Sequence, residues 1–190
     1  SYGLSGVPFW SHDAGGFFGE PSFNLYIRWI QFGFLTSHTR CYGTTPRHPW
    51  AYGDEAVRIF KKYANLRYQL LPYLYTYAKV ASVSGLPLIR ALDVEFQDDI
   101  NTYDKDLQYM LGKDIMVAPI FSDEGRIWIY FPQGKWFSWW DDSTYQGPST
   151  LFYTADIDEL PIFVKAGAII PLGPTMDYVC LLYTSDAADE

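Results

Sequence analysis

The spacing of apolar residues changes near Gly85, and this change limits the possible folds more than any other feature of the chain. From Asp54 to Gly85, apolar side chains recur at the three- and four-residue steps of an amphipathic helix. Asp54 and Glu55 provide an N-cap and a negative first turn, and Gly85 is a typical helix stop. This segment predicts a long helix. We expect it to kink or break near Leu70, because Pro72 removes a backbone donor and clashes with the preceding turn.

The pattern after Leu86 is typical of strands. Short runs rich in β-branched and aromatic residues are separated by Gly, Pro and Asp turns, as in an all-β sandwich. The runs are PLIRALDVEF, DIMVAPIF, RIWIYF, KWFSWW, TLFYTA and PIFVKAGAII. Helical spacing does not return beyond a short turn at residues 106–111, and Asp141-Asp142 is expected to form a hairpin turn. We therefore expect a domain boundary near Gly85.

The first 85 residues alternate between strand-like and helical segments. Residues 4–18 contain an apolar run that ends in His12 and Asp13, which predicts a buried strand followed by a loop. Residues 21–33 have helical spacing, and residues 32–43 repeat the first pattern, an apolar run that leads to a polar His38. The order strand, helix, strand, helix predicts an α/β fold for this half, followed by a β fold.

Charge and composition exclude several classes of function. The chain has 14 Lys and Arg against 22 Asp and Glu, a net charge of −8, and no basic cluster that could bind a phosphate backbone or an anionic membrane surface. No apolar stretch is long enough to cross a bilayer. We therefore expect no nucleic-acid and no membrane partner, and a neutral or polyhydroxyl ligand fits better.

Cysteine usage and known motifs point to no metal and no cofactor. Cys41 and Cys180 make neither a disulfide framework nor a metal cluster, and the sequence has no phosphate loop or zinc motif. The chain opens on Ser1 with no visible signal peptide. The compartment stays unknown from the sequence, with a cytoplasmic location slightly favoured.

The end of the first predicted strand collects residue types that suit a sugar site. Trp10, His12, Asp13 and Phe17 combine carboxylate oxygens, which accept hydrogen bonds from hydroxyls, with aromatic faces for the C–H side of a ring. His38 stands at the equivalent end of the second predicted strand. If the two strands are parallel neighbours, His38 and Asp13 would open onto the same rim.

Simpler interpretations of these residues stay open. An Asp before Gly-Gly is often a turn former or an N-cap, and a single His beside an apolar strand is usually a structural hydrogen-bonding group. Arg40 could orient either Asp13 or His38 through a charge-assisted hydrogen bond.

Six motifs in order resemble the closing part of a glycoside hydrolase family 31 enzyme, over residues 3–173. They are GLSGVPFWSHDAGGF, RWIQFGFLTSHTR, LRYQLLPYLYTYA, QYMLGKDIMVAPI, YFPQGKWFSWW and LPIFVKAGAIIPL. The resemblance implies the last two βα units of a (β/α)8 barrel at residues 1–85 and a proximal C-terminal β-sandwich domain at residues 86–179. Residues 180–190 fit neither pattern and resemble a translated sequencing adapter or a disordered acidic tail.

The resemblance also implies a reaction. It is the retaining, exo-acting hydrolysis of a terminal α-linked sugar of an oligosaccharide, with one carboxyl group as nucleophile and one as acid/base. In the family both carboxyl groups lie upstream of this fragment, so no catalytic residue is assigned and the isolated fragment is expected to be inactive and prone to aggregation. Asp13 matches a substrate-binding carboxylate and His38 a hydroxyl-binding histidine, while Trp10 and Phe17 would shape the pocket. A homo-oligomer of the full-length enzyme is left open.

Alternative functions remain at this point. The variants WSHDAGG and SHTR are more similar to bacterial α-xylosidases than to α-glucosidases, yet an α-glucosidase is the nearest alternative. From another class comes a non-catalytic carbohydrate-binding β-module, in which Trp136, Trp139 and Trp140 would form an exposed planar patch. Burial of these rings would exclude that module. A structural accessory domain without a ligand is a third possibility.

Overall fold

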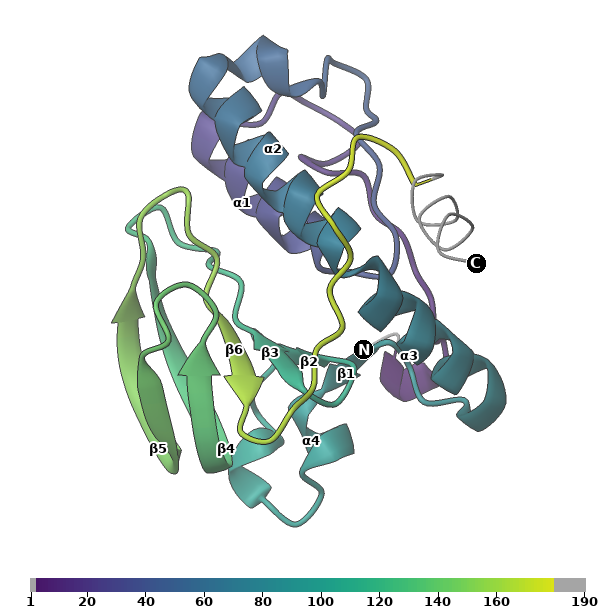
Figure 1. Cartoon of the computed structure of the whole chain (residues 1–190). Coiled ribbons are helices and arrows are strands. Elements are labelled where there is room, and N and C mark those ends of the chain that lie inside the picture. The colour runs from purple at the N-terminus through teal and green to yellow at the C-terminus, as the bar shows by residue number, and fades with distance from the viewer. Residues whose placement is uncertain (1–2, 180–190) are drawn as a thin grey trace.

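The computed structural model describes residues 3–179, which form a helical part and an antiparallel sheet (Figure 1). The predictions for residues 180–190 lie outside this range. The helical part contains η1 (Gly3–Ser5), α1 (Phe23–Phe34), η2 (Pro49–Tyr52), α2 (Asp54–Gln69) and α3 (Leu71–Ser84). The second part contains β1 (Ile89–Ala91), α4 (Leu92–Glu95), η3 (Ile100–Thr102), β2 (Tyr109–Leu111), β3 (Ile115–Val117), β4 (Arg126–Ser138), β5 (Thr144–Thr154) and β6 (Ile162–Lys165).

The helices follow the sequence pattern closely, except that the N-cap of α2 is Gly53 and not an acidic residue; Asp54 and Glu55 lie in its first turn. The Ser22 hydroxyl caps α1 by accepting a hydrogen bond from the Leu25 N–H at 3.3 Å. The predicted break in the long helix is confirmed, since Leu70 separates α2 from α3 and Pro72 occupies the first turn of α3. Gly85 ends α3 in the left-handed conformation with φ of 77°, where a residue without a Cβ is favoured.

The two strands predicted in the first half are extended segments with little regular pairing. Residues 7–12 form no strand, and residues 32–34 belong to the end of α1. The segments meet in one isolated parallel bridge between Asp13 and Arg40. A regular strand needs a neighbour that hydrogen-bonds along its length, and the described residues pair over only this short stretch.

The six strands share one antiparallel sheet in the order β1-β2-β3-β6-β4-β5. Two of the predicted runs, RIWIYF and KWFSWW, form the single long strand β4, which carries a register shift between Phe131 and Gly134. The predicted hairpin turn at Asp141-Asp142 joins β4 to β5, with Asp142 at a φ of 58°. In the run PLIRALDVEF only the first half is a strand, because the chain turns into α4 at Leu92.

The sheet buries apolar side chains on both faces, because successive residues of a strand point to opposite sides. Leu111, Ile115 and Val117 join a core that includes the buried faces of α1, α2 and α3. Met110 and Met116, one residue away in β2 and β3, join a second core with Trp136 of β4. The helical part and the sheet therefore share a core. Among residues 3–179, none of the helices has the length and apolar character needed to cross a bilayer.

Candidate functional site

Asp13 and Arg40 form the centre of the candidate site. In the parallel bridge, the Ala14 N–H donates to the Arg40 carbonyl at 2.9 Å, and the Arg40 N–H donates to the His12 carbonyl at 3.3 Å. The side chains also pair, because Nε of Arg40 donates to Oδ1 of Asp13. This hydrogen bond and the charge of Asp13 raise the pKa of Arg40. Of the two partners that the sequence left open for Arg40, Asp13 is the one it contacts.

His38 lies two residues before Arg40, the bridge partner of Asp13. Its exposed imidazole contacts the ring of Phe9 edge-on, with 6.2 Å between the ring centroids. The bridge thus brings the segment that carries His38 beside the segment that carries Asp13.

Trp10 and His12 point toward α1. The ring of Trp10 lies 6.1 Å from that of Phe32, and the imidazole of His12 stacks on the same Phe32 at 5.1 Å. The indole N–H of Trp29 donates to Nδ1 of His12 at 2.9 Å. The sequence analysis grouped these two residues with Asp13, but the alternation of an extended segment puts neighbours on opposite sides.

The hydrogen bonds of His12 fix the tautomer of the ring. Since Nδ1 accepts from Trp29, the proton of a neutral imidazole resides on Nε2, which lies 3.2 Å from the Thr36 hydroxyl. That hydroxyl donates in turn to the Gly33 carbonyl at 2.7 Å. Burial lowers the pKa of His12, while the charge of Asp13 opposes the effect. His12 is therefore a neutral group that links the Asp13 segment to α1.

Phe17 lies on a loop whose shape depends on a buried arginine. The exposed Phe17 ring contacts Tyr42 at 5.6 Å, and the guanidinium of Arg40 stacks over Tyr42 at 5.0 Å. Arg47 is 2% exposed and ties the two loops together, donating to the carbonyls of Gly16 at 3.0 Å and Gly19 at 2.8 Å. An arginine can serve several carbonyl groups at once through its planar set of N–H donors. The aromatic side chains beside Asp13 thus project from loops that are fixed in place.

Sequence reasoning missed Arg47, Trp29 and Thr36. Arg47 stands in a Pro-rich loop where a charged residue is expected to be exposed, and nothing in the local pattern marks it as buried. Trp29 was assigned to an amphipathic helix without a role for its N–H. Only a chemical argument could have indicated Trp29 and Thr36. If His12 is half-buried, both of its ring nitrogens need hydrogen-bond partners, which polar side chains nearby must supply.

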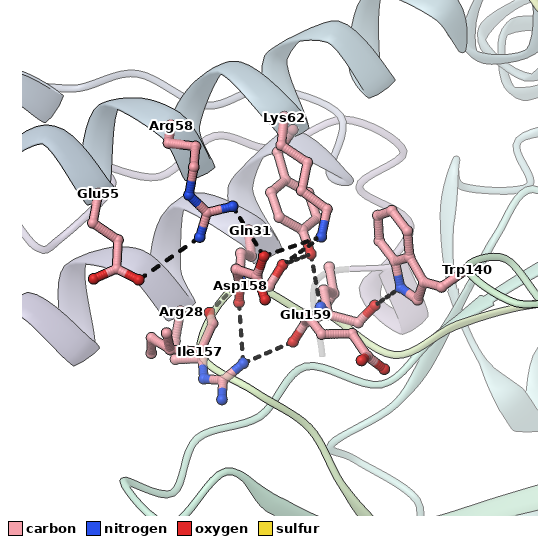
Figure 2. A network of polar contacts seen from close by, with 11 residues as sticks. Arg28, Gln31, Glu55, Arg58, Lys62, Trp140, Ile157, Asp158 and Glu159 are labelled. Carbon is pink, nitrogen blue, oxygen red and sulfur yellow. Dashed lines mark hydrogen bonds and ion pairs between the residues drawn. The ribbon is translucent and has the colours of Figure 1, made fainter.

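A polar network joins α1 and α2 to the chain between β5 and β6 (Figure 2). Arg28 donates to the carbonyl of Glu159 at 2.7 Å and to that of Ala155 at 3.3 Å, and Gln31 donates to the carbonyl of Ile157 at 2.7 Å. From α2, Lys62 and Tyr63 both reach the Asp158 carbonyl, at 2.8 and 3.1 Å. Arg58 pairs with the Asp158 carboxylate at 3.1 Å.

This network, which we call the interdomain clasp, comprises Arg28, Gln31, Arg58, Lys62, Tyr63 and residues 155–160. Most contacts of the clasp are made to backbone carbonyl groups. The clasp therefore depends on the backbone conformation of the β5–β6 connection more than on the side chains of that connection. Arg28 and Gln31 lie on the same helix as Trp29 and Phe32, which hold His12. Thus α1 contacts both the site segment and the β-domain.

The three tryptophans of the proposed carbohydrate platform are packed into the protein. Trp136 is 0% exposed and belongs to the second core. Trp139 and Trp140 are half-buried against the first core, and the indole N–H of Trp140 donates to the Leu160 carbonyl at 2.7 Å. The exposed planar patch required for a carbohydrate-binding module at these residues does not exist.

The described residues show no metal centre. Among residues 3–179, no three His, Cys, Asp or Glu side chains gather in a way that could hold a metal ion. The chemistry of the site is that of a carboxylate, an imidazole and aromatic rings.

Helices beside a short parallel pairing, followed by a docked antiparallel sheet, form the arrangement expected at the end of an α/β barrel with a β-domain attached. Comparison with family models agrees with this architecture. Residues 1–77 match the glycosyl hydrolases family 31 TIM-barrel domain, and residues 85–170 match the glycosyl hydrolase family 31 C-terminal domain. The chain belongs to glycosyl hydrolase family 31, as the motifs predicted.

Individual relatives include several glycosidases. The chain is 47% identical over 178 residues to the α-xylosidase XylQ of Lactiplantibacillus pentosus. The aligned region covers 90% of this chain and 23% of XylQ. It is 40% identical to α-glucosidase 2 of Bacillus thermoamyloliquefaciens, over 90% of this chain and 22% of that protein. Among solved structures, the GH31 dextranase of Flavobacterium johnsoniae complexed with glucose superposes with a TM-score of 0.86 at 36% identity, covering 93% of this chain and 23% of the dextranase. The chain therefore spans less than a quarter of the length of these relatives.

Proposed function

We propose that this chain forms the closing part of a retaining, exo-acting α-glycosidase that removes a terminal α-linked sugar from an oligosaccharide, with an α-xyloside as its preferred substrate. The observation that carries the proposal is the parallel bridge that brings the segments of Asp13 and His38 side by side, in a chain of this family. The 47% identity to an α-xylosidase supports the choice of sugar.

In this proposal Asp13 and His38 hold hydroxyl groups of the terminal sugar. A carboxylate can accept several hydrogen bonds, so its pairing with Arg40 leaves capacity for ligand hydroxyls. Phe17 offers an apolar face to the C–H side of the ring. We assign Trp10 and His12 a supporting role in place of sugar contact, because their rings pack against α1.

We further propose that the nucleophile and the acid/base are supplied by other parts of the barrel. Hydrolysis with retention needs two carboxyl groups on either side of the anomeric carbon, and the family resemblance assigns neither role to Asp13. Residues 1–190 alone would then bind sugar weakly and would not hydrolyse an aryl α-xyloside. Turnover by the purified chain above a buffer blank would refute this part of the proposal.

The binding roles can be tested in a full-length protein made by exchanging this chain for the matching part of XylQ. His38→Ala should lower kcat/KM for an aryl α-xyloside by roughly 10- to 100-fold, since a hydrogen bond to a polar ligand group contributes about 1–3 kcal/mol. Asp13→Asn should have an effect of at least that size. Asp98→Asn, at an exposed position of the β-domain, is the control. Unchanged kinetics in both site variants would contradict the assignment.

An α-glucosidase is the second candidate, favoured by the 40% identity to α-glucosidase 2. The two substrates differ by a C6 hydroxymethyl group, which a pocket closed at that position rejects sterically. Comparing kcat/KM for the aryl α-xyloside and the aryl α-glucoside in the same full-length protein distinguishes the two.

A further inference from the structure

Strand β5 forms one edge of the six-stranded sheet (Figure 1). It pairs with β4 on one side, and no described strand pairs with its other side. An edge strand presents a row of N–H and C=O groups that its sheet leaves unpaired. Within residues 3–179, no backbone hydrogen bond joins the outer side of residues 149–154 to another part of the chain. This edge is therefore open to a further strand.

The two halves of β5 differ in how this edge is protected. Pro148 has no N–H to donate, and the register shift of β4 between Phe131 and Gly134 lies opposite it. The second half, residues 149–154, has the sequence STLFYT, which combines high strand propensity with no charged side chain. Natural edge strands usually carry a lysine, a proline or a bulge that discourages pairing with another chain. Residues 149–154 lack these protections.

An exposed aromatic pair borders the open edge. Phe152 is 47% exposed, and its partner in the register is Trp128 of β4, which is 65% exposed. Their ring centroids are 4.8 Å apart. Thr150 and Thr154 flank Phe152 on the same face, because alternate residues of a strand point to the same side. A partner strand at this edge would remove apolar surface from water and would also pair the backbone.

The rest of a longer protein joins this chain away from β5. At the first described residues, η1 lies against β1, which is the opposite edge of the sheet. At the other end, the N–H of Gly173 donates to the Gln69 carbonyl at 2.7 Å, and the Gln69 amide donates to the Thr175 hydroxyl at 3.3 Å. The chain thus leaves the described part beside the end of α2. Figure 1 shows both places apart from β5.

We propose that residues 149–154 are a dimer interface, in which β5 pairs antiparallel with β5 of a second copy across a two-fold axis at Phe152. In such a pair each strand meets its own sequence, so a charged strand would bring like charges close together, which is destabilising. The strand has no charge and is therefore self-complementary, although the whole chain has a net charge of −8. This inference does not rest on the proposed function.

The position of the axis follows from the aromatic pair. With the axis at Phe152, that residue faces Phe152 of the second copy, and Thr150 faces Thr154 of the second copy. Trp128 of each copy lies one strand farther from the axis on the same face, so four aromatic rings form a continuous stripe. Opposite Cβ atoms at Phe152 would be about 5 Å apart, whereas the two Trp128 positions would be separated by three strand spacings, about 14 Å.

Cysteine cross-linking tests this register. Phe152→Cys and Trp128→Cys are purified as the 190-residue chain and treated with a bifunctional thiol reagent too short to bridge the Trp128 positions. Phe152→Cys should give a link between two copies of residue 152, and Trp128→Cys, the matched control on the same face, should give several-fold less. Peptide mapping by mass spectrometry distinguishes this link from any at Cys41 or Cys180.

Sedimentation velocity over a range of concentrations measures the dimer itself. The unmodified chain should show a monomer–dimer equilibrium. Phe152→Lys should raise the dimer dissociation constant by at least about tenfold, because it places two like charges opposite each other. Trp128→Lys also replaces an exposed aromatic ring with a charge, but it should raise the constant by less than about threefold, since the two charges would be about 14 Å apart. Unchanged unfolding midpoints in both variants would show that the fold is intact.

Several results would overturn the proposal. They are a chain that stays monomeric at every concentration, equal cross-linking at residues 152 and 128, and association that Phe152→Lys does not weaken. The same cysteine variants are also made in the full-length protein in which this chain replaces the matching part of XylQ. Protection of residue 152 there without a cross-link would identify another segment of the same protein as the occupant, which would also overturn the dimer.

Glycosidase activity of the full-length protein is measured separately. Phe152→Lys should leave kcat/KM for an aryl α-xyloside unchanged while it weakens the dimer. An inactive full-length protein that still cross-links at residue 152 would count against the proposed function only, and an active protein without the cross-link would count against this inference only.

Discussion

The indole N–H of Trp29 donates to Nδ1 of His12 at 2.9 Å, and this bond places the proton of the neutral imidazole on Nε2. A protonated ring would present a second N–H toward the indole donor, and the bond would be lost. Burial lowers the pKa of His12, which agrees with a neutral ring. The segment that carries Asp13 is therefore fixed to α1 by a contact that holds only while His12 is uncharged.

We predict that the chain loses stability as the pH falls below about 6.5, the ordinary value for histidine. In the unfolded chain His12 binds a proton below that pH, whereas in the folded chain its lower pKa keeps it neutral. The unfolded state then binds more protons, so the free energy of unfolding falls on acidification, by at most about 1.4 kcal/mol per pH unit for one group. The loss ends below the lowered pKa of the folded state.

Urea unfolding at a series of pH values measures this effect. His12→Gln should flatten the pH dependence, because glutamine does not titrate. His48→Gln changes an exposed imidazole that stacks on Trp50 at 4.6 Å and should leave the dependence in place. The same slope in His12→Gln and in the unmodified chain would show that another group is responsible.

The interdomain clasp should derive its stability from Arg28 more than from Arg58, although both contact the same loop. Arg28→Ala removes half-buried hydrogen bonds to two carbonyls and should lower the free energy of unfolding by about 2–3 kcal/mol. Arg58→Ala removes an ion pair whose arginine side chain is 57% exposed and should cost about 0–1 kcal/mol. Denaturant unfolding of the two variants measures both losses of stability. Equal losses would contradict the claim that burial makes the contacts of Arg28 more stabilising than those of Arg58.

The two loops beside Asp13 should depend on the shape of the Arg47 guanidinium. Arg47→Lys keeps the charge, yet a single ammonium group cannot reach the carbonyls of both Gly16 and Gly19. We expect a loss of about 2–3 kcal/mol in the free energy of unfolding. Arg126→Lys, at an exposed position of β4, should change it by less than about 0.5 kcal/mol. A neutral Arg47→Lys would mean that the loops hold their shape without this residue.

Gly112→Ala should destabilise the protein far more than Gly167→Ala. Both have positive φ, 63° and 83°, so alanine is strained at either by about 1–2 kcal/mol. At Gly112 the new methyl would also lie 2.6 Å from the Tyr73 hydroxyl, whereas nothing lies within 4 Å of the equivalent position at Gly167. The clash should add about 1–3 kcal/mol at Gly112 only. Thermal unfolding of the two variants gives the comparison, and similar midpoints would show that the tyrosines can move aside.

Local patterns predicted most of the helices because their signals lie within a few residues. The period of apolar residues and Pro72 together predicted α2, α3 and the break at Leu70. The position of β4 was harder to predict. Two short runs appeared separate around Pro132 and Gly134, but pairing with β5 on one side and β6 on the other makes them one strand. Long-range hydrogen bonds of this kind leave no local pattern.

In the candidate site too, local patterns predicted some features and long-range contacts determined others. Asp13 and His38 could be selected from the sequence because polar residues follow apolar runs there. The approach of their two segments depends on the bridge between Asp13 and Arg40, which joins residues 27 positions apart. The side on which Trp10 and His12 lie depends on α1, whose rings they contact.

By itself, the sequence determined the helix ends, the strand-rich character of the second half, the family and the residue types at the site, because each is written in a short stretch of chain. Only the tertiary structure decided that Arg47 is a buried tie between loops, that Trp136 belongs to the core, and that Arg28 holds the β-domain through carbonyl groups. These features depend on which distant segments meet. A side chain becomes buried or hydrogen-bonded through partners that folding brings to it, and their positions cannot be read from its neighbours in the chain.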